Sequence, residues 1–454
     1  MTKKILAFVL PLLISAPAVQ AGVDLIAIGQ VDGNYQDLSA KSASTLENGV
    51  AGNILGGVGS GLAYAGGNTF LALPDRGPNA VAYNATIDDT TSYINRFHTF
   101  NLSLAVNPNY DALTVGSLPY ILSPALTATT LLSNGNPLTY ALNGAPSINT
   151  TSKYYYTGRS DNFNPARKST NYLNGRLDPE GIRVSKDGKS IFISDEYGPY
   201  VYQFNRSTGR LIKAFKLPSY YAVSNLRAFE KGADGEIAVN SIGRTTNKGM
   251  EGLAITPDGN TLIGVMQTEL RQDTKKYVRI VSIDIATNVT HEYAYLLTDG
   301  SGISEIVAIN NHEFLVDERD GKGLGDGSSA VVKKLYKIDL SNATDISGIT
   351  SIGAGTAVVN KTLFLDVVAK LMANGINATE IPSKIEAVAF GPDLVVNGIT
   401  KHTLFIANDN DFLPTVGGIN NPNKFFVFTV DQADLPNFVP QTIAPLAIDN
   451  NDRG

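Results

Sequence analysis

Residues 178–196 read DPEGIRVSKDGKSIFISDE, and this stretch contains the pattern that decides the fold. Two short apolar-rich runs, 182–184 and 191–193, flank the pair Asp187-Gly188. Asp-Gly is a preferred two-residue turn between antiparallel strands because it tolerates positive φ. The stretch therefore predicts a β-hairpin that begins and ends in acidic residues.

The same phrase recurs along the chain. It consists of a carboxylate, a small residue, alternating apolar positions, a turn and a second apolar run. Further copies contain Glu251, Glu305 and Glu386, and a degenerate copy without the glutamate covers residues 59–76. A further strand pair follows the hairpins, and the repeated glutamates lie 54 to 81 residues apart. Four strands per unit at this spacing predict an all-β protein with the fold of a β-propeller.

The number of blades follows from the number of copies. Five copies are visible, and a further blade can lie within residues 124–175 or 225–240. Six blades are therefore expected, and seven are possible. Residues 124–175, rich in Asn, Ser, Thr and Tyr, are expected to form a long insertion between the first two blades, either a surface loop or a lid over a ligand site. A β-sandwich array is the alternative fold, but it explains the repeating acidic ends less well.

The N-terminus predicts export. Two lysines precede the apolar run 5–14, and small residues follow as far as Ala21. This order is typical of a signal peptide over residues 1–21, cleaved after Ala21. Residues 22–454 are then expected to form a single propeller domain in the periplasm or the medium. No later apolar run approaches the ~18 residues of a membrane span, so none is expected.

Composition excludes several classes of protein. The chain of 454 residues has no cysteine, which removes thiol nucleophiles, disulfides and thiolate metal sites. Its 36 basic residues against 42 acidic residues give no support for nucleic-acid binding. The four histidines lie far apart, and no G-x-S-x-G motif is present. Acidic side chains are therefore the main candidates for chemistry.

Several phrases resemble the bacterial family described as esterase-like activity of phytase, or phytase-like. The matching motifs follow one another across roughly residues 50–432 and are PDRGPN (74–79), DPEGI (178–182), SDEYGP (194–199), NKGMEGLA (247–254), DERDG (317–321) and IANDNDF (406–412). One departure is Ala387, which follows Glu386 where the repeat usually has glycine. The resemblance implies hydrolysis of phosphate esters or related small-molecule esters, with the repeated acids suspected of carrying it.

The propeller fold predicts where these acids lie. The innermost strand of each blade runs beside the central channel, so equivalent strand ends form a ring at one mouth. If the four repeated glutamates are equivalent, their carboxylates converge there, and a second set forms from Asp195, Asp317 and Asp409. Carboxylates that are close together raise one another's pKa. The usual relief is a hard cation, here most plausibly Ca²⁺, or neutralisation by arginines.

Roles can be assigned to these side chains. The candidate calcium ligands are Glu180, Glu251, Glu305, Glu386 and Asp409. Glu196 or Glu318 is the candidate general base, and Arg76 and Arg319 are candidates for binding an anionic group. In the alternative interpretation, the glutamates only cap neighbouring blades through backbone N–H groups, and Arg319 pairs with Glu318 or Asp320.

Three classes of function remain open. The first is a hydrolase of phosphate esters or related esters, which predicts dependence on both metal and arginine. The second is a calcium-dependent lactonase or sugar-ester hydrolase, which needs the metal but no anion-binding arginines. The third is a non-enzymatic propeller that binds a ligand or a protein, for which the acidic ring can be purely structural.

Overall fold

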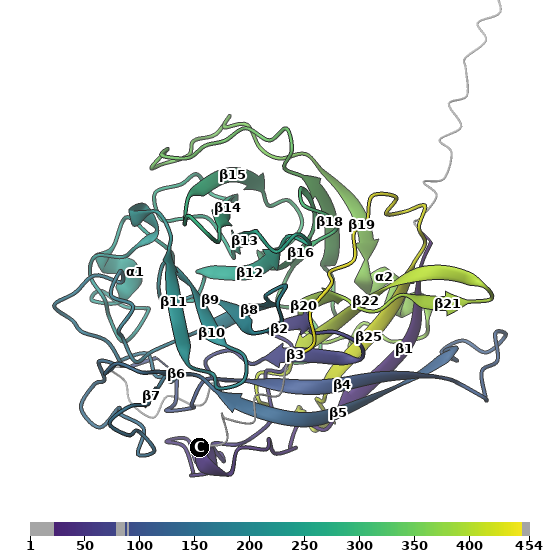
Figure 1. Cartoon of the computed structure of the whole chain (residues 1–454), viewed down its shortest axis with the longest axis horizontal. Helices are drawn as coiled ribbons and strands as arrows, with labels where there is room; N and C mark the ends of the chain where they lie inside the picture. Colours follow the sequence, from purple (N-terminus) through teal and green to yellow (C-terminus); the bar gives the residue numbers. More distant parts are fainter. Residues whose placement is uncertain (1–21, 79–86, 89, 447–454) are drawn as a thin grey trace, which may run out of the picture.

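The computed structural model describes residues 22–78, 87–88 and 90–446, and its antiparallel sheets surround a common axis (Figure 1). The innermost strands gather at the centre and are β2 (Gly61–Tyr64), β8 (Pro179–Val184), β12 (Met250–Ile255), β16 (Gly302–Ala308) and β20 (Lys384–Phe390). Each innermost strand contacts the next, and β20 contacts β2, so the ring is closed. The predicted all-β propeller is confirmed.

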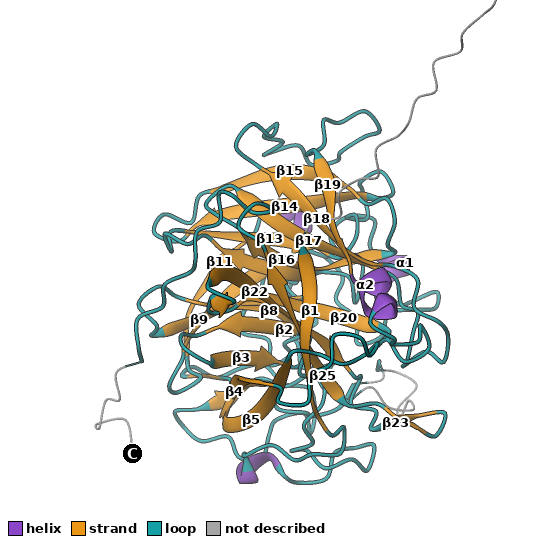
Figure 2. Cartoon of the chain, turned by 90° about the vertical axis from the view of Figure 1, so that its right-hand side faces the viewer, coloured by secondary structure: helices purple, strands orange, loops and turns teal. Residues whose placement is uncertain are grey.

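The first four blades continue outwards from the innermost strand in sequence order, and Figure 2 shows them from the side. Their outer strands are β3 (Thr69–Leu73), β4 (Arg96–Val106) and β5 (Tyr120–Leu131); β9 (Ser190–Asp195), β10 (Tyr200–Asn205) and β11 (Leu211–Lys216); β13 (Thr261–Met266), β14 (Tyr277–Asp284) and β15 (Thr290–Leu296); and β17 (Glu313–Arg319), β18 (Lys333–Asp339) and β19 (Lys361–Asp366). Each repeat phrase forms the hairpin expected of it. Gly188, in the first Asp-Gly turn, has a φ of 72°, the positive value that such a turn requires.

The fifth blade joins the two ends of the chain. Its strands run outwards from β20 through β22 (Ile399–Asp409) and β25 (Asn423–Val430) to β1 (Val23–Val31). The N-terminal strand β1 pairs antiparallel with β25. The N-terminal segment therefore completes the last blade before the chain continues into the first.

The described residues form five blades, so the expectation of six was wrong. Residues 124–131 belong to β5, the outermost strand of the first blade, and not to an insertion. In the rest of that segment, β6 (Ser133–Asn134) and β7 (Tyr154–Tyr155) form only a two-stranded ribbon. Residues 225–240 contain the short helix α1 (Glu236–Val239) instead of strands. Neither segment supplies a further blade.

A few short elements complete the described chain. They are η1 (Ala40–Ser42), η2 (Ser219–Tyr221), α2 (Val367–Ala373), β21 (Leu394–Val396), which pairs with β22, and the ribbon of β23 (Thr415–Val416) with β24 (Ile419–Asn420). Among the described residues, no helix could span a bilayer. The expected signal peptide lies outside the described residues.

Apolar side chains fill the spaces between blades. At the closure of the ring, Phe70 of the first blade meets Phe405 of the fifth, with ring centroids 4.5 Å apart. Both side chains are buried. Close-packed aromatic contacts of this kind supply much of the stability of a core.

This contact gives a test of the closure. We expect Phe405→Ala to lower the free energy of unfolding by about 3–5 kcal/mol, because it leaves a cavity between the first and last blades. Val395→Ala is the control, since Val395 is 64% exposed, and its effect should stay within about 0.5 kcal/mol. Urea unfolding measures both. Equal losses in the two variants would contradict the importance of this interface.

Candidate functional site

Two rings of side chains meet at one mouth of the channel, because each innermost strand starts where the antiparallel strand beside it ends. The register of each pair defines the equivalent positions. The start positions are Ser60, Glu180, Glu251, Ser304 and Glu386. The end positions are Asp75, Glu196, Gln267, Arg319 and Asp409. Three of the four repeated glutamates thus lie at the mouth, together with Asp409 and Glu196.

Burial raises the pKa of most carboxyl groups in this ring, and repulsion between neighbours adds to the effect. The repelling pairs follow the circumference and are Glu180 with Glu251, Glu251 with Glu196 and with Glu386, Glu386 with Asp409, Asp409 with Asp75, and Asp75 with Glu180. Of the four glutamates that the sequence predicted to converge, Glu180, Glu251 and Glu386 therefore lie close enough to repel one another.

Glu305 occupies a different position from the other repeated glutamates. A β-bulge falls at Glu251 in β12 and at Glu386 in β20, but in β16 it falls at Ser304. Ser304 is therefore the equivalent of the ring glutamates, and Glu305 lies one residue further along the strand. Because successive side chains point to opposite sides, this shift removes Glu305 from the ring.

Glu305 lies in the channel behind the mouth. Its Oε1 accepts hydrogen bonds from the amides of Leu253 (3.0 Å) and Ile306 (2.9 Å). Its Oε2 lies 3.1 Å from a guanidinium nitrogen of Arg183. Burial raises the pKa of Glu305 to about 7, although Arg183 acts in the opposite direction. The carboxylate thus binds protein groups within the channel.

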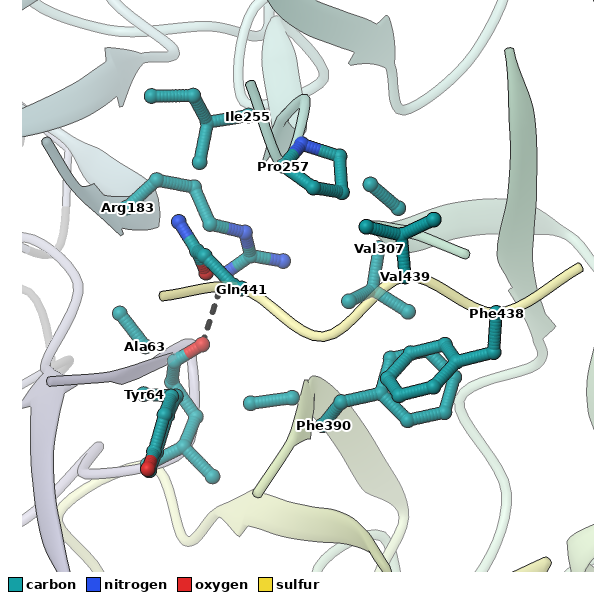
Figure 3. A pocket seen from close by; sticks show the side chains of 13 residues that line it. Ala63, Tyr64, Arg183, Ile255, Pro257, Val307, Phe390, Phe438, Val439 and Gln441 are labelled. Carbon is teal, nitrogen blue, oxygen red and sulfur yellow. Dashed lines mark hydrogen bonds between the residues drawn. The ribbon is translucent and has the colours of Figure 1, made fainter. Parts of the chain in front are cut away.

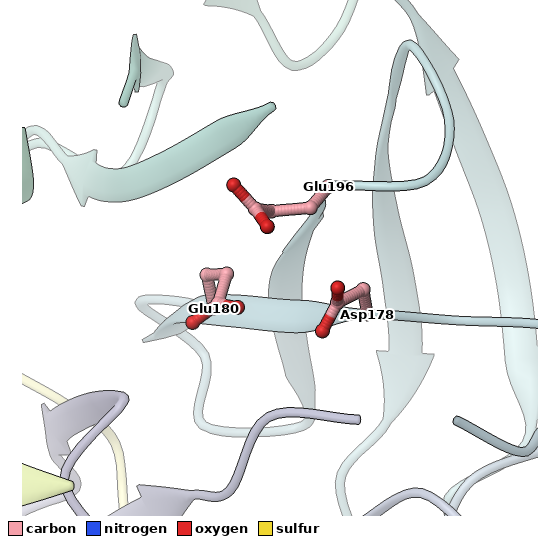
Figure 4. A group of neighbouring side chains, drawn as sticks. All are labelled: Asp178, Glu180 and Glu196. Atoms are coloured by element: carbon pink, nitrogen blue, oxygen red, sulfur yellow. The ribbon is translucent and has the colours of Figure 1, made fainter. Parts of the chain in front are cut away.

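Three carboxylates converge on the second blade. Asp178 directly precedes β8, Glu180 lies on it, and Glu196 follows β9 (Figure 4). Each offers one oxygen atom, and these oxygens lie within 4.8 Å of one another. The amide of Glu196 donates to the carbonyl of Asp178 at 2.9 Å, which fixes the two chain segments side by side. All three residues are buried.

Glu251 extends this triad towards the third blade. Its Oε1 accepts a hydrogen bond from Gln267 Nε2 at 2.9 Å, whereas its Oε2 is buried and has no hydrogen-bond partner among the described residues. Beside it, Glu196 Oε1 accepts from the amide of Gly249 at 2.6 Å. Burial, together with the nearby Asp178, raises the pKa of Glu196 to about 7. An orphaned oxygen beside several carboxylates fits a hard cation, which binds oxygen ligands.

The arginines of the mouth are paired with its acids. Arg76 Nη1 donates to Asp178 Oδ2 at 2.7 Å and also to the side chain of Asn247. Arg319 Nε donates to Ser304 Oγ at 2.5 Å, and its Nη2 donates to Glu386 of the next blade. The structure therefore pairs Arg319 with Glu386, and not with Glu318 or Asp320.

Lys384 adds a cation that the sequence pattern did not reveal. Its Nζ donates to Asp409 Oδ2 at 2.9 Å and also pairs with Asp411. With Arg319, it places positive charge on the side of the mouth formed by the fourth and fifth blades. The triad and Glu251 lie on the second and third blades, so the mouth is electrostatically uneven.

Glu318, a candidate general base, does not reach the mouth. Tyr295 donates to its Oε1 at 2.6 Å, Lys361 also donates to that oxygen, and the amide of Asp299 donates to its Oε2 at 2.9 Å. Burial alone would raise the pKa of Glu318, but these donors, with Lys361 foremost, lower it. Glu318 thus links β15 and the loop that follows it to β19.

The second acidic set expected from the sequence is not a ring. Asp409 is at the mouth, but Asp195 accepts from the amides of Asp178 (3.2 Å) and Tyr197 (3.0 Å) within its own blade. Asp317 lies one register position before the end ring. Sequence reasoning missed Asp75, Gln267 and Lys384 at the mouth. Aligning the repeats on their strand ends, instead of on their acidic residues, would have found Asp75 and Gln267.

The unpaired oxygen of Glu251 gives a first test of the mouth. In the presence of EDTA, we expect Glu251→Gln to raise the melting temperature by about 2–4 °C, because the buried carboxyl group either carries a charge that Glu196 and Glu386 repel or takes up a proton at a cost in stability. Asp258→Asn is the matched control, since Asp258 lies in the turn at the opposite end of the same hairpin. A lower melting temperature for Glu251→Gln would contradict the idea that this charge is destabilising.

The raised pKa of Glu305 predicts a pH dependence. Between the ordinary glutamate value of 4.5 and about 7, folded Glu305 binds more protons than the unfolded chain does. The free energy of unfolding should therefore fall as pH rises through this range. Glu305→Gln lacks this contribution, so wild type should lose stability relative to the variant by up to about 1.4 kcal/mol per pH unit. Urea unfolding across this range measures the difference, and a constant difference would contradict the raised pKa.

Comparison with known proteins gives a family. A family model described as esterase-like activity of phytase matches residues 53–412. An uncharacterised secreted protein of Arthroderma benhamiae is 32% identical over 177 residues, which are 32% of this chain and 34% of the relative. The chain thus matches about a third of that curated relative's length.

Solved structures show only a weak similarity to the chain. The periplasmic gluconolactonase of Pseudomonas aeruginosa has a TM-score of 0.33 and 11% identity, with 89% of this chain and 99% of that chain covered. A gluconolactonase of Xanthomonas campestris has a TM-score of 0.31 and 10% identity, with 91% and 98% covered. Because the family model spans most of the described chain, the protein belongs to the family described as esterase-like activity of phytase.

Proposed function

We propose that this protein is an exported hydrolase of phosphate esters or related esters, and that its active site is the acidic mouth of the propeller. The observation that carries the proposal is the convergence of Asp178, Glu180 and Glu196 beside the unpaired oxygen of Glu251. Buried carboxylates at this density are rarely kept without a function, because each raises the cost of ionising the others. Family membership supports ester hydrolysis as that function.

The donor set suits a hard divalent cation, and Ca²⁺ is the proposed ion. Asp178, Glu180 and Glu251 would hold it, since all three offer carboxylate oxygens on the same side of the mouth. A cation bound there polarises an ester or phosphoryl oxygen and lowers the pKa of a bound water. Among these three acids, Asp178 already pairs with Arg76, so the ion would mainly offset the charges of Glu180 and Glu251.

Glu196 is the proposed general base. The amide of Gly249 fixes one of its oxygens at 2.6 Å, which orients the carboxyl group beside the other acids. Its pKa, raised by burial to about 7, allows it to take up a proton at neutral pH. A base whose pKa lies near the working pH combines a useful ionised fraction with sufficient basicity.

A lactonase or sugar-ester hydrolase is the second candidate, and one observation favours it. Arg76 and Arg319, expected to bind an anionic group, form hydrogen bonds with Asp178 and Glu386. An arginine already paired with a buried carboxylate offers less to a phosphate. An uncharged ester or lactone would not need those arginines. A binding propeller without activity remains the third candidate.

Two observations support the proposal that the protein is exported. The predicted signal peptide at residues 1–21 is one, and the secreted relative from Arthroderma benhamiae is the other. A periplasmic or extracellular location would also give the protein ready access to calcium. We therefore propose that the mature chain acts outside the cytoplasm.

The test combines metal dependence with turnover. We expect Ca²⁺ to raise the melting temperature of the EDTA-treated protein and to switch on hydrolysis of a chromogenic phosphate ester. Glu180→Gln should lose both responses, because it removes a proposed ligand. Glu196→Gln should keep the thermal response but lower kcat at least about 100-fold, as loss of a general base does.

Controls separate the candidates. Asp258→Asn, at the opposite end of the channel, should behave as wild type in both assays. Hydrolysis of a lactone in place of the phosphate ester would transfer the proposal to the second candidate. Calcium stabilisation without turnover of either substrate would favour a binding protein, and no response to calcium would refute the metal site.

A further inference from the structure

The central channel is lined by strands whose backbone groups have no partner strand on that side. Each innermost strand is an edge strand, so N–H and C=O groups on its channel side lack a neighbouring strand. Such groups are costly when buried without a partner. Something must therefore fill the channel and bind the backbone groups of several blades together.

Arg183 of β8 is the side chain that meets the carbonyl groups. Its Nη1 donates to the carbonyls of Ile182 (2.6 Å) and Leu62 (2.7 Å). Its Nη2 donates to the carbonyls of Ile306 (2.8 Å) and Val388 (3.3 Å). These four carbonyls hold equivalent positions on the second, first, fourth and fifth blades. One guanidinium thus bridges four blades.

Glu305 completes the arrangement. It accepts from the amide of Leu253 on the third blade and pairs with Arg183. The guanidinium group can only donate hydrogen bonds and therefore binds carbonyls, whereas the carboxylate accepts them and therefore binds an amide. All five blades are therefore held by one buried ion pair on the axis.

The far end of the channel is closed over this pair. Residues 438–441 cross it, with Val439 donating to the carbonyl of Ile309 at 2.9 Å and Gln441 to that of Val184 at 3.3 Å. The cavity left between this segment and Arg183 is about 30 Å³, which leaves room for water but not for a substrate (Figure 3). The acidic mouth is therefore a blind site, open only on its own side.

The oxygen atoms around Arg183 form a cation-binding set in their own right. Four backbone carbonyls and one carboxylate are the ligand types that hold small cations in proteins. We propose that the channel centre is a cation-binding site, distinct from the acidic mouth. In the native protein, the guanidinium group of Arg183 occupies this site as a cation supplied by the chain itself. The ligand class that fits is a small planar cation with several N–H donors. This site takes no part in the proposed hydrolysis.

The proposal predicts chemical rescue. Arg183→Ala should leave the oxygen set without its cation and should destabilise the protein. Free guanidinium at about 20 mM, far below its denaturing range, should then raise the melting temperature of the variant in a saturable way, by about 2–4 °C. Urea at the same concentration is the matched probe, because it has the same shape without the charge, and it should have no such effect.

Two variants control the experiment. Arg206→Ala removes another buried arginine of the same blade, whose guanidinium meets a single carbonyl, that of Gly188, and it should show no rescue. Glu305→Gln combined with Arg183→Ala should weaken guanidinium binding at least about tenfold, because the only carboxylate of the set is lost. If Arg183→Ala does not fold alone, refolding yield replaces melting temperature as the readout. Equal effects of guanidinium and urea would overturn the proposal, as would rescue of Arg206→Ala.

Discussion

The pairing of Arg183 with Glu305 on the propeller axis is the interaction on which the rest of the structure depends. Five innermost strands turn unpaired carbonyls and amides towards the same narrow channel. A single side chain can reach four blades because five strands enclose a small ring. Arg183 binds backbone carbonyls and Glu305 binds a backbone amide, so the ion pair fixes the positions of the five innermost strands along the propeller axis. Because these strands are fixed along the axis, the positions of their ends at the mouth are fixed as well.

The mouth concentrates charge that the fold does not neutralise evenly. Arg319 and Lys384 pair with Glu386 and Asp409 on the side of the fourth and fifth blades. On the side of the second and third blades, several carboxylates depend on protons or on an external cation, with Arg76 as the partner of Asp178. Such an arrangement costs stability, and proteins tolerate this cost mainly where function needs it. The uneven distribution therefore indicates where on the mouth a cation would act.

Sequence reasoning predicted the hairpins because alternation and Asp-Gly turns are local properties of the chain. It overcounted the blades because residues 124–131 were assigned to an insertion, whereas they continue β5, an outermost strand whose side chains are mostly exposed or half-buried. The closing strand β1 lies outside the repeat and pairs with β25 near the other end of the chain, so that Val23 lies opposite Val430. The ring acids Glu180, Glu251, Glu386 and Asp409 could be found from the repeats. Lys384 could not, since its role depends on contacts made only in the folded ring.

The misplacement of Glu305 explains how one motif serves two purposes. In β12 and β20 the bulge carries the glutamate to the mouth, whereas in β16 the bulge falls one residue earlier and the glutamate faces the channel. Ser304 then occupies the ring position, where it accepts a hydrogen bond from Arg319. The fourth blade thereby removes one negative charge from the mouth and adds one positive charge. The same one-residue shift provides the acid that pairs with Arg183. The position of one β-bulge thus contributes both to the filling of the channel and to the asymmetry of the mouth.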